Sequence, residues 1–188
     1  MLLSRTEVTA SIHPADREHT MSYRRRIHVP GSTYYTVRRT ESAVEIFAEP
    51  SDYDAFEDFL AFALEATGVK LLGYCWMPDA IHLAITIGRR PVAELMRRVT
   101  RYCSHRIRER IAPSVTIFPA DFPVTLIDPD VYLVPLIHYI HNIPVLSGKA
   151  ATPDDYPYTS HFAYLGEKQH LRVHTKHLLA MLHHISLH

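Results

Sequence analysis

The sequence predicts an α+β fold, a ferredoxin-like sandwich in which an antiparallel sheet has helices packed on one face. The expected elements follow the order strand, helix, strand, strand, helix, strand, with one added helix, and this order is typical of that fold. The 188 residues, 47% of them hydrophobic, suit one compact domain with tails. Because this fold carries many unrelated functions, it does not by itself indicate a chemistry.

Hydrophobic periodicity and turn residues place the elements along the chain. Short apolar or β-branched runs predict strands, and longer stretches with apolar residues three and four apart predict helices. The strands are expected at 33–37, 70–76, 81–87 and 124–127, and the helices at 51–68, 91–111 and 131–141. Ser51 is expected to cap the first helix, Gly68 to end it, and Pro144 to end the last one.

Charge is distributed unevenly, although the formal net charge is zero. Residues 41–69 carry eight acidic side chains and no lysine or arginine, whereas residues 89–110 carry eight arginines and two glutamates. The zero net charge argues against a protein that coats nucleic acid indiscriminately, but one side should be basic. Arginine suits paired contacts with phosphate or guanine, although a genome rich in G and C favours arginine as well.

The expected location is cytoplasmic. The apolar runs are far shorter than the roughly 20 residues that a membrane span requires. The N-terminus also lacks the apolar segment of a signal peptide. Cys75 and Cys103 allow at most one disulfide, and we interpret both as buried thiols.

Three separated segments carry recognisable motifs. Residues 23–35 join a basic lead-in to a Pro-Gly turn and an aromatic strand, and residues 73–83 hold a strand, a Met-Pro turn and an Ala-Ile-His pattern. Residues 139–145 read Tyr-Ile-His-Asn-Ile-Pro-Val, and residues 155–160 read Asp-Tyr-Pro-Tyr-Thr-Ser. In this order and spacing they resemble the REP-associated tyrosine transposases of the single-tyrosine HUH superfamily, over roughly residues 23–166.

The resemblance implies a site for DNA strand transfer. In that family, two histidines two residues apart on a strand and a polar side chain on a later helix hold Mg²⁺ or Mn²⁺, and a tyrosine attacks the scissile phosphate. Here Tyr139 matches the nucleophile and His82 the second histidine. Ala80 stands in place of the first histidine, and Ile143 stands where the third ligand is expected. The family's Gly-Arg-aromatic segment is also replaced, by residues 119–123.

These replacements predict a DNA-binding protein with a degenerate active site and no metal cofactor, in which Tyr139 and His82 are vestigial. A histidine such as His82, taken alone, is more often a hydrogen-bonded core residue than a ligand. One alternative is an active transposase or nickase that forms a phosphotyrosine link through Tyr139, with Asp79, His138 and His141 rebuilding the metal site. Another is a relic or a protein-interaction module that binds no nucleic acid.

The expected partner is hairpin or single-stranded DNA from palindromic repeats. The basic lead-in resembles the segment that, in the family, helps to bind single-stranded guide sequences, and the helix at 91–111 presents arginines to phosphates. Alternatively, the basic lead-in is a solvated tail, and the arginine face of the helix at 91–111 is an ordinary solvated surface. Tyr34 and Tyr35 alternate across a strand, so one should pack inward while the other stacks on a base. The candidate DNA-binding residues are Arg24, Arg25, Arg26, Arg97, Arg98 and Arg101.

The chain divides into a mobile tail at 1–22, the transposase-like domain at 23–166, and a histidine-rich helix or tail at 167–188. His170, His174 and His177 have a spacing that would place three imidazoles on one helical face, where they would bind Zn²⁺ or Ni²⁺. No acidic partner or cysteine accompanies them, so a surface helix is the preferred interpretation. Such a helix would make solubility, or the formation of a homodimer, depend on pH near about 6.

Overall fold

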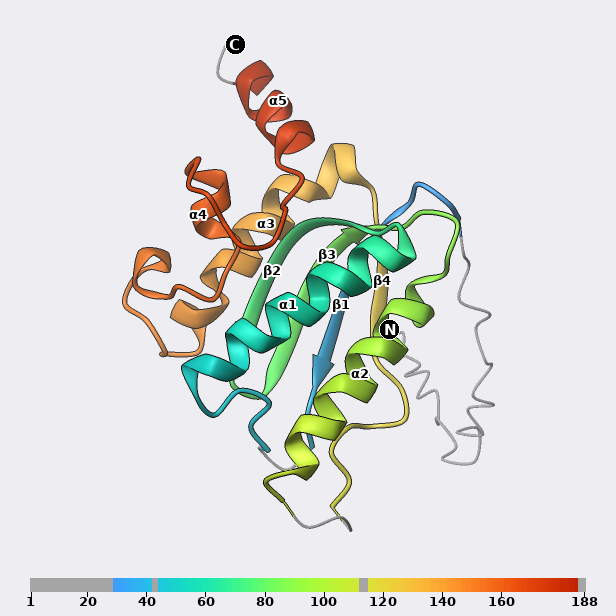
Figure 1. Ribbon diagram of the computed structural model, residues 1–188. Coiled ribbons are helices and arrows are strands. Elements are labelled where there is room, and N and C mark those ends of the chain that lie inside the picture. The colour runs from blue at the N-terminus through green and yellow to red at the C-terminus, as the bar shows by residue number, and fades with distance from the viewer. Residues whose placement is uncertain (1–28, 42–43, 112–114, 186–188) are drawn as a thin grey trace, which may run out of the picture.

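A computed structural model describes residues 29–41, 44–111 and 115–185 (Figure 1). The predicted tail at 1–22 and the three arginines Arg24, Arg25 and Arg26 lie outside the described residues. None of the described helices is long and apolar enough to cross a membrane. Cys75 and Cys103 are both free and buried, as predicted.

Four antiparallel strands form one sheet in the order β2-β3-β1-β4. The strands are β1 (Thr33–Arg39), β2 (Lys70–Met77), β3 (Ala80–Thr86) and β4 (Val124–Ile127). The helices are α1 (Pro50–Thr67), α2 (Val92–Arg108), α3 (Pro129–Leu146), α4 (His161–Tyr164) and α5 (Lys176–Ile185), with a 3-10 turn η1 (Pro153–Asp155). The order β1-α1-β2-β3-α2-β4 and the antiparallel sheet confirm the predicted ferredoxin-like fold.

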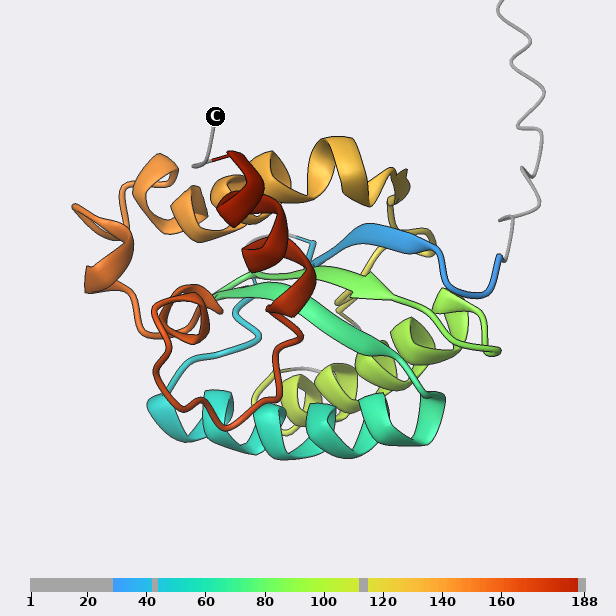
Figure 2. The ribbon, with the colours of Figure 1, turned by 90° about the horizontal axis from the view of Figure 1, so that it is seen from above.

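The sheet is covered on both faces. Figure 2 shows it as the middle layer, with α1 and α2 on one side and α3 on the other. Side chains of a strand alternate between faces. Ile81, Leu83 and Ile85 therefore pack into the core beneath α1 and α2, whereas Ala80 and Ala84 pack into a second core beneath α3. The added helix that the sequence predicted thus covers the face that the other two helices leave open.

Helix α1 begins earlier than the sequence indicated. The expected N-cap, Ser51, is wrong, because Glu49 occupies that position and Pro50 opens the helix. Proline fits the first helical turn because its missing N–H would have no partner there. The Asp52 carboxylate accepts hydrogen bonds from the backbone N–H groups of Ala48 and Glu49, at 2.9 and 3.2 Å. Gly68 ends the helix as predicted, with a left-handed φ of 67°.

The segment that follows α3 is attached to the edge strand β2. Thr159 bridges Cys75, and the Ser160 hydroxyl accepts the Tyr74 backbone N–H at 3.0 Å. Further along, the His174 backbone N–H donates to the Leu71 carbonyl at 2.8 Å. Leu171 joins the first core and Leu178, on α5, joins the second. Residues 171–178 are therefore packed against the sheet and α3.

A buried histidine ties α3 to this segment. The His141 Nε2 lies 2.8 Å from the Ser160 Oγ, and the imidazole is packed beside His161 and Tyr164. Burial, and then the charges that His161 and His138 would carry, lower the pKa of His141 to about 3. The folded protein therefore holds this ring neutral at pH 7.

Gly73 marks the place where α3 comes close to β2, because a Cβ at this position would overlap the Ile137 Cδ1 and lie 3.3 Å from the Ser160 Oγ. Gly73→Ala is expected to lower the free energy of unfolding by about 1–3 kcal/mol through overpacking. In an Ile137→Val background, which lacks the Cδ1 methyl, the same substitution should cost ~1 kcal/mol less. Urea unfolding of the four proteins measures this coupling. Additive costs would show that the two side chains do not collide.

The neutral state of His141 predicts a specific loss of stability in acid. Its folded pKa is depressed, so protons bind the unfolded chain more readily once the pH falls below the ordinary value of about 6.5. Stability is then lost as the pH falls from there toward about 3. His141→Gln should reduce the slope of the unfolding free energy by about 0.7 kcal/mol per pH unit at pH 6.5, rising toward about 1.4 at pH 5. Equal slopes in urea titrations of the two proteins would contradict the buried neutral ring.

Candidate functional site

Two of the positions that the resemblance assigns to metal ligands lie in a buried apolar core. Ala80 is completely buried, with 0% of its surface exposed, and Ile143 is buried in the same core. Both belong to a cluster that also contains Met77, Cys75 and Ile140. A methyl and a branched alkyl group offer no lone pair, so these positions contribute packing to the α3 face and no coordination.

His82 lies on the same face of β3 as Ala80, two residues further along the strand. Its Nδ1 is 2.8 Å from the Tyr35 hydroxyl, and its Nε2 is hidden from solvent without a hydrogen-bond partner among the described residues. Burial, and to a smaller extent the charge of nearby Arg39, lower the pKa of His82 to about 4, while Asp79 opposes the shift. His82 is thus a neutral, buried histidine that is bonded through one nitrogen.

Tyr35 connects His82 to Tyr139. Its ring is stacked beside the imidazole at a centroid separation of 6.2 Å and meets the Tyr139 ring edge-on at 6.3 Å. Burial, and then the neighbouring Tyr139, raise the pKa of Tyr35, so its hydroxyl stays protonated. Tyr139 itself projects from α3 with 45% of its surface exposed. Three aromatic rings therefore run from the buried imidazole out to solvent.

These three rings line one wall of a cavity of about 390 Å³. Arg39 lines it as well, while forming an ion pair with Asp79. Four residues of the 119–123 segment also line it, namely Pro119, Asp121, Phe122 and Pro123. Strand β1 holds this segment: the Thr36 hydroxyl donates to the Pro123 carbonyl at 2.8 Å, and Arg38 donates to the Asp121 carbonyl at 3.2 Å. The segment that departs from the family motif thus shapes the cavity beside Tyr139.

The sequence assigned Tyr34 and Tyr35 only as a pair. Tyr34 packs into the core beneath α1 and α2, with 5% of its surface exposed. Tyr35, on the other face, is the tyrosine that reaches the cavity. Alternation along the strand predicts that the two side chains point to opposite faces of the sheet. The position of α3 determines which of these faces carries the cavity.

The side chains that the alternative of a rebuilt metal site requires are engaged elsewhere. His141 is bonded to Ser160, Asp79 is paired with Arg39, and the exposed His138 has the Asn142 amide 3.4 Å away. In the described part of the chain, no three His, Cys, Asp or Glu side chains are grouped closely enough to share a metal ion. The residues present at His82 therefore do not fit a divalent cation, since Mg²⁺ requires several oxygen ligands.

The predicted arginines of α2 lie on the opposite side of the sheet from Tyr139 (Figure 2). Arg97 and Arg101 are exposed, whereas Arg98 lies 3.4 Å from the Glu94 carboxylate. The structure brings Tyr139 and His82 together through Tyr35, but it does not bring these arginines to them.

The C-terminal histidines do not share a helical face. Helix α5 begins only at Lys176, so His170 and His174 precede it. His170 lies 2.9 Å from the Asp58 carboxylate, and His177 lies 3.5 Å from the Asp130 carboxylate. The expected i, i+4, i+7 arrangement is wrong because the chain first pairs with β2, at Val173, before it becomes helical.

Comparison with known proteins gives a likeness of structure alone. No protein-family model and no curated protein sequence matches this chain. The solved structure of a REP-associated tyrosine transposase bound to a REP hairpin superposes on 78% of this chain and 87% of that one, with a TM-score of 0.67 and 15% identity. A transposase candidate from Deinococcus radiodurans covers 66% of this chain and 95% of its own, at 14% identity and a TM-score of 0.44, which is too low to support a conclusion. The chain therefore has the fold of a REP-associated tyrosine transposase.

Proposed function

We propose that this protein is a DNA-binding member of the REP-associated tyrosine transposase family that binds hairpin or single-stranded DNA without cutting it. Two findings support the proposal. The fold is that of a transposase whose solved structure contains a REP hairpin. The cavity beside Tyr139 keeps aromatic and basic side chains, whereas Ala80 and Ile143 lie in an apolar core.

The apolar environment of Ala80 is the main observation that supports the proposed absence of cleavage. A tyrosine attacking a phosphodiester needs a cation that neutralises the developing charge and fixes the phosphate. Here one imidazole remains, and its Nδ1 is already engaged by Tyr35. Without the cation, the Tyr139 hydroxyl faces a fully charged phosphodiester, which repels an attacking phenolate. The same residues can still hold DNA.

Aromatic stacking gives Tyr139 a role that needs no metal. Unpaired bases stack on exposed tyrosine rings, and each such contact contributes roughly 1–3 kcal/mol. Tyr139 is half exposed at the cavity, with Tyr35 supporting it from behind and Arg39 nearby. A base turned out of a hairpin or a single-stranded flank would lie against Tyr139, with an adjacent phosphate near Arg39.

The arginines of α2 supply a separate contribution. Arg97 and Arg101 are exposed on the far side of the sheet, so one short strand cannot contact them and Tyr139 together without passing around an edge. We assign them, with Arg98, to contacts with the phosphates of a longer DNA, together with Arg24, Arg25 and Arg26. Such contacts add affinity that falls with salt and carries no sequence information.

Binding should depend on the ring of Tyr139 and not on its hydroxyl. Tyr139→Ala is expected to weaken binding of an imperfect palindrome with a single-stranded tetranucleotide flank about tenfold, because a stacking surface is lost. Tyr139→Phe should bind like the wild type. Fluorescence anisotropy at about 150 mM salt measures both.

Tyr132→Ala is the matched control, because Tyr132 is 57% exposed on the same helix but does not line the cavity. The wild type should also prefer the hairpin to an unstructured strand of equal composition by at least about tenfold. Equal binding of the two DNAs, or an equal loss in Tyr132→Ala, would contradict the assignment of the site.

Cleavage provides the second test. With Mn²⁺ and a single-stranded substrate, the wild type is expected to form no covalent protein–DNA adduct on a denaturing gel. A variant carrying Ala80→His and Ile143→Asn restores two ligand positions, and a gain of adduct there would show that the fold still positions DNA. An adduct in the wild type that disappears in Tyr139→Phe would instead establish an active nickase.

A further inference from the structure

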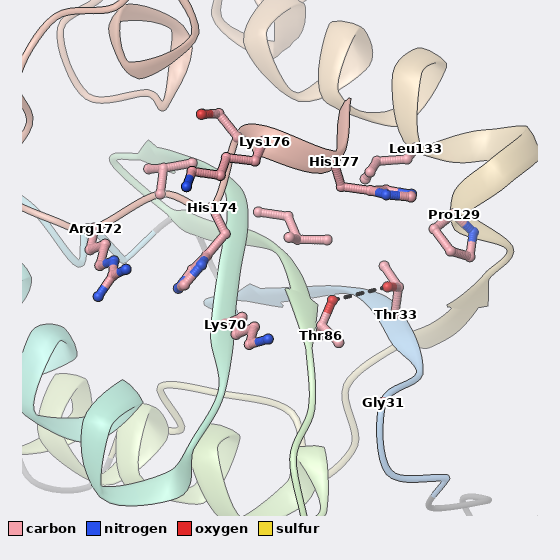
Figure 3. A pocket seen from close by; sticks show the side chains of 13 residues that line it. Gly31, Thr33, Lys70, Thr86, Pro129, Leu133, Arg172, His174, Lys176 and His177 are labelled. Carbon is pink, nitrogen blue, oxygen red and sulfur yellow. Dashed lines mark hydrogen bonds between the residues drawn. The ribbon is translucent and has the colours of Figure 1, made fainter. Parts of the chain in front are cut away.

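A second cavity, of about 490 Å³, lies at the opposite end of the α3-covered face (Figure 3). It is bounded by the start of β2 at Lys70, the end of β3 at Thr86, the first turn of α3 and residues 172–177. Thr86 and His82 are four residues apart on β3, which corresponds to about 13 Å along a strand. The cavity contains neither Tyr139 nor His82, so it is a different site.

The cavity gathers positive charge without compensating acids. Lys70, Arg172 and Lys176 line it together with His174, as Figure 3 shows, and no carboxylate is among its lining residues. No ion pair joins any of the three cations to a carboxylate within the described part of the chain. Among the other lining residues, His177 lies 3.5 Å from the Asp130 carboxylate.

Backbone contacts hold these cations together against their mutual repulsion. Residues 171–174 run alongside β2, with Val173 bridging Leu71 and the His174 backbone N–H donating to the Leu71 carbonyl at 2.8 Å. Leu171 is buried and anchors the segment. Burial, followed by the charges of Arg172 and Lys70, lowers the pKa of His174, so the positive field is felt inside the cavity.

Hydroxyl groups supply neutral donors at the same place. The Thr33 and Thr86 oxygens lie 3.1 Å apart, and the dashed line in Figure 3 marks this bond. Two hydroxyls carry two hydrogens, and their mutual bond uses one of them. The pair therefore has one hydrogen left for an acceptor in the cavity.

We propose that this second cavity is a phosphate-binding site, in which Lys70, Arg172 and Lys176 contact the anion and the Thr33–Thr86 pair donates to it. A phosphate group offers several oxygens to the guanidinium fork of Arg172 and to the two ammonium groups at once. The cavity also has room for an organic group attached to the phosphate. The ligand is thus a free phosphate ion or the terminal phosphate of a nucleotide chain.

Isothermal titration of the full chain with inorganic phosphate, at constant ionic strength in chloride, tests the site. Saturable binding is expected, together with shifts of the His174 ring resonances in NMR spectra. The double variant Lys70→Gln, Arg172→Gln should weaken this binding at least about tenfold, because two charge-assisted contacts are lost. Lys149→Gln with Lys168→Gln is the matched control, since it removes the same charge from exposed positions elsewhere.

A pair of dinucleotides, one with a 5′-phosphate and one with a 5′-hydroxyl, distinguishes the two sources of phosphate. If only the phosphorylated form competes with inorganic phosphate, the ligand is a nucleotide terminus; if neither competes, it is the free ion. Thermal unfolding of each variant confirms that it is folded. No saturable phosphate binding, or an equal loss in the control pair, would overturn the proposal. Tyr139→Ala should leave phosphate binding unchanged, which separates this outcome from a failure of hairpin binding.

Discussion

The packing of α3 against the sheet determines both the second hydrophobic core and the position of the candidate site. The helix approaches β2 closely at Gly73, and it buries the face of β3 that carries Ala80 and His82. Ile143 and Ile140 fill the space next to Ala80. In the same contact α3 also presents Tyr139 to the cavity, so one interface determines both the second core and the candidate site.

This interface explains how the fold remains stable with apolar residues at two of the expected ligand positions. Exchanging polar ligands for Ala80 and Ile143 adds buried apolar surface, which stabilises the contact between α3 and β3. It also removes the desolvation cost of polar groups that would have no cation to bind. Because Tyr139 projects from the same helix, this packing also holds its ring beside Tyr35 at the cavity.

The sequence predicted the fold, and it shows apolar residues at two expected ligand positions, because both observations rest on local patterns. The strands follow from short apolar runs, and Ala80 lies two positions before His82 in a motif three residues long. Local sequence patterns do not predict contacts between segments that are distant along the chain. The bond between Tyr35 and His82 joins β1 to β3, and the cluster of Lys70 with Arg172 exists only because residues 171–174 pair with β2. The histidine spacing near the C-terminus was misread because pairing with β2 delays the helix.

We infer that the positions around His82 do not form a site for a divalent cation. Electron paramagnetic resonance of free Mn²⁺, during titration of the hairpin-bound protein, tests it most directly. The wild type and His82→Gln should give the same free Mn²⁺ signal at every concentration, because any binding then belongs to DNA. A stoichiometric loss of free Mn²⁺ in the wild type that is absent in His82→Gln would contradict the claim.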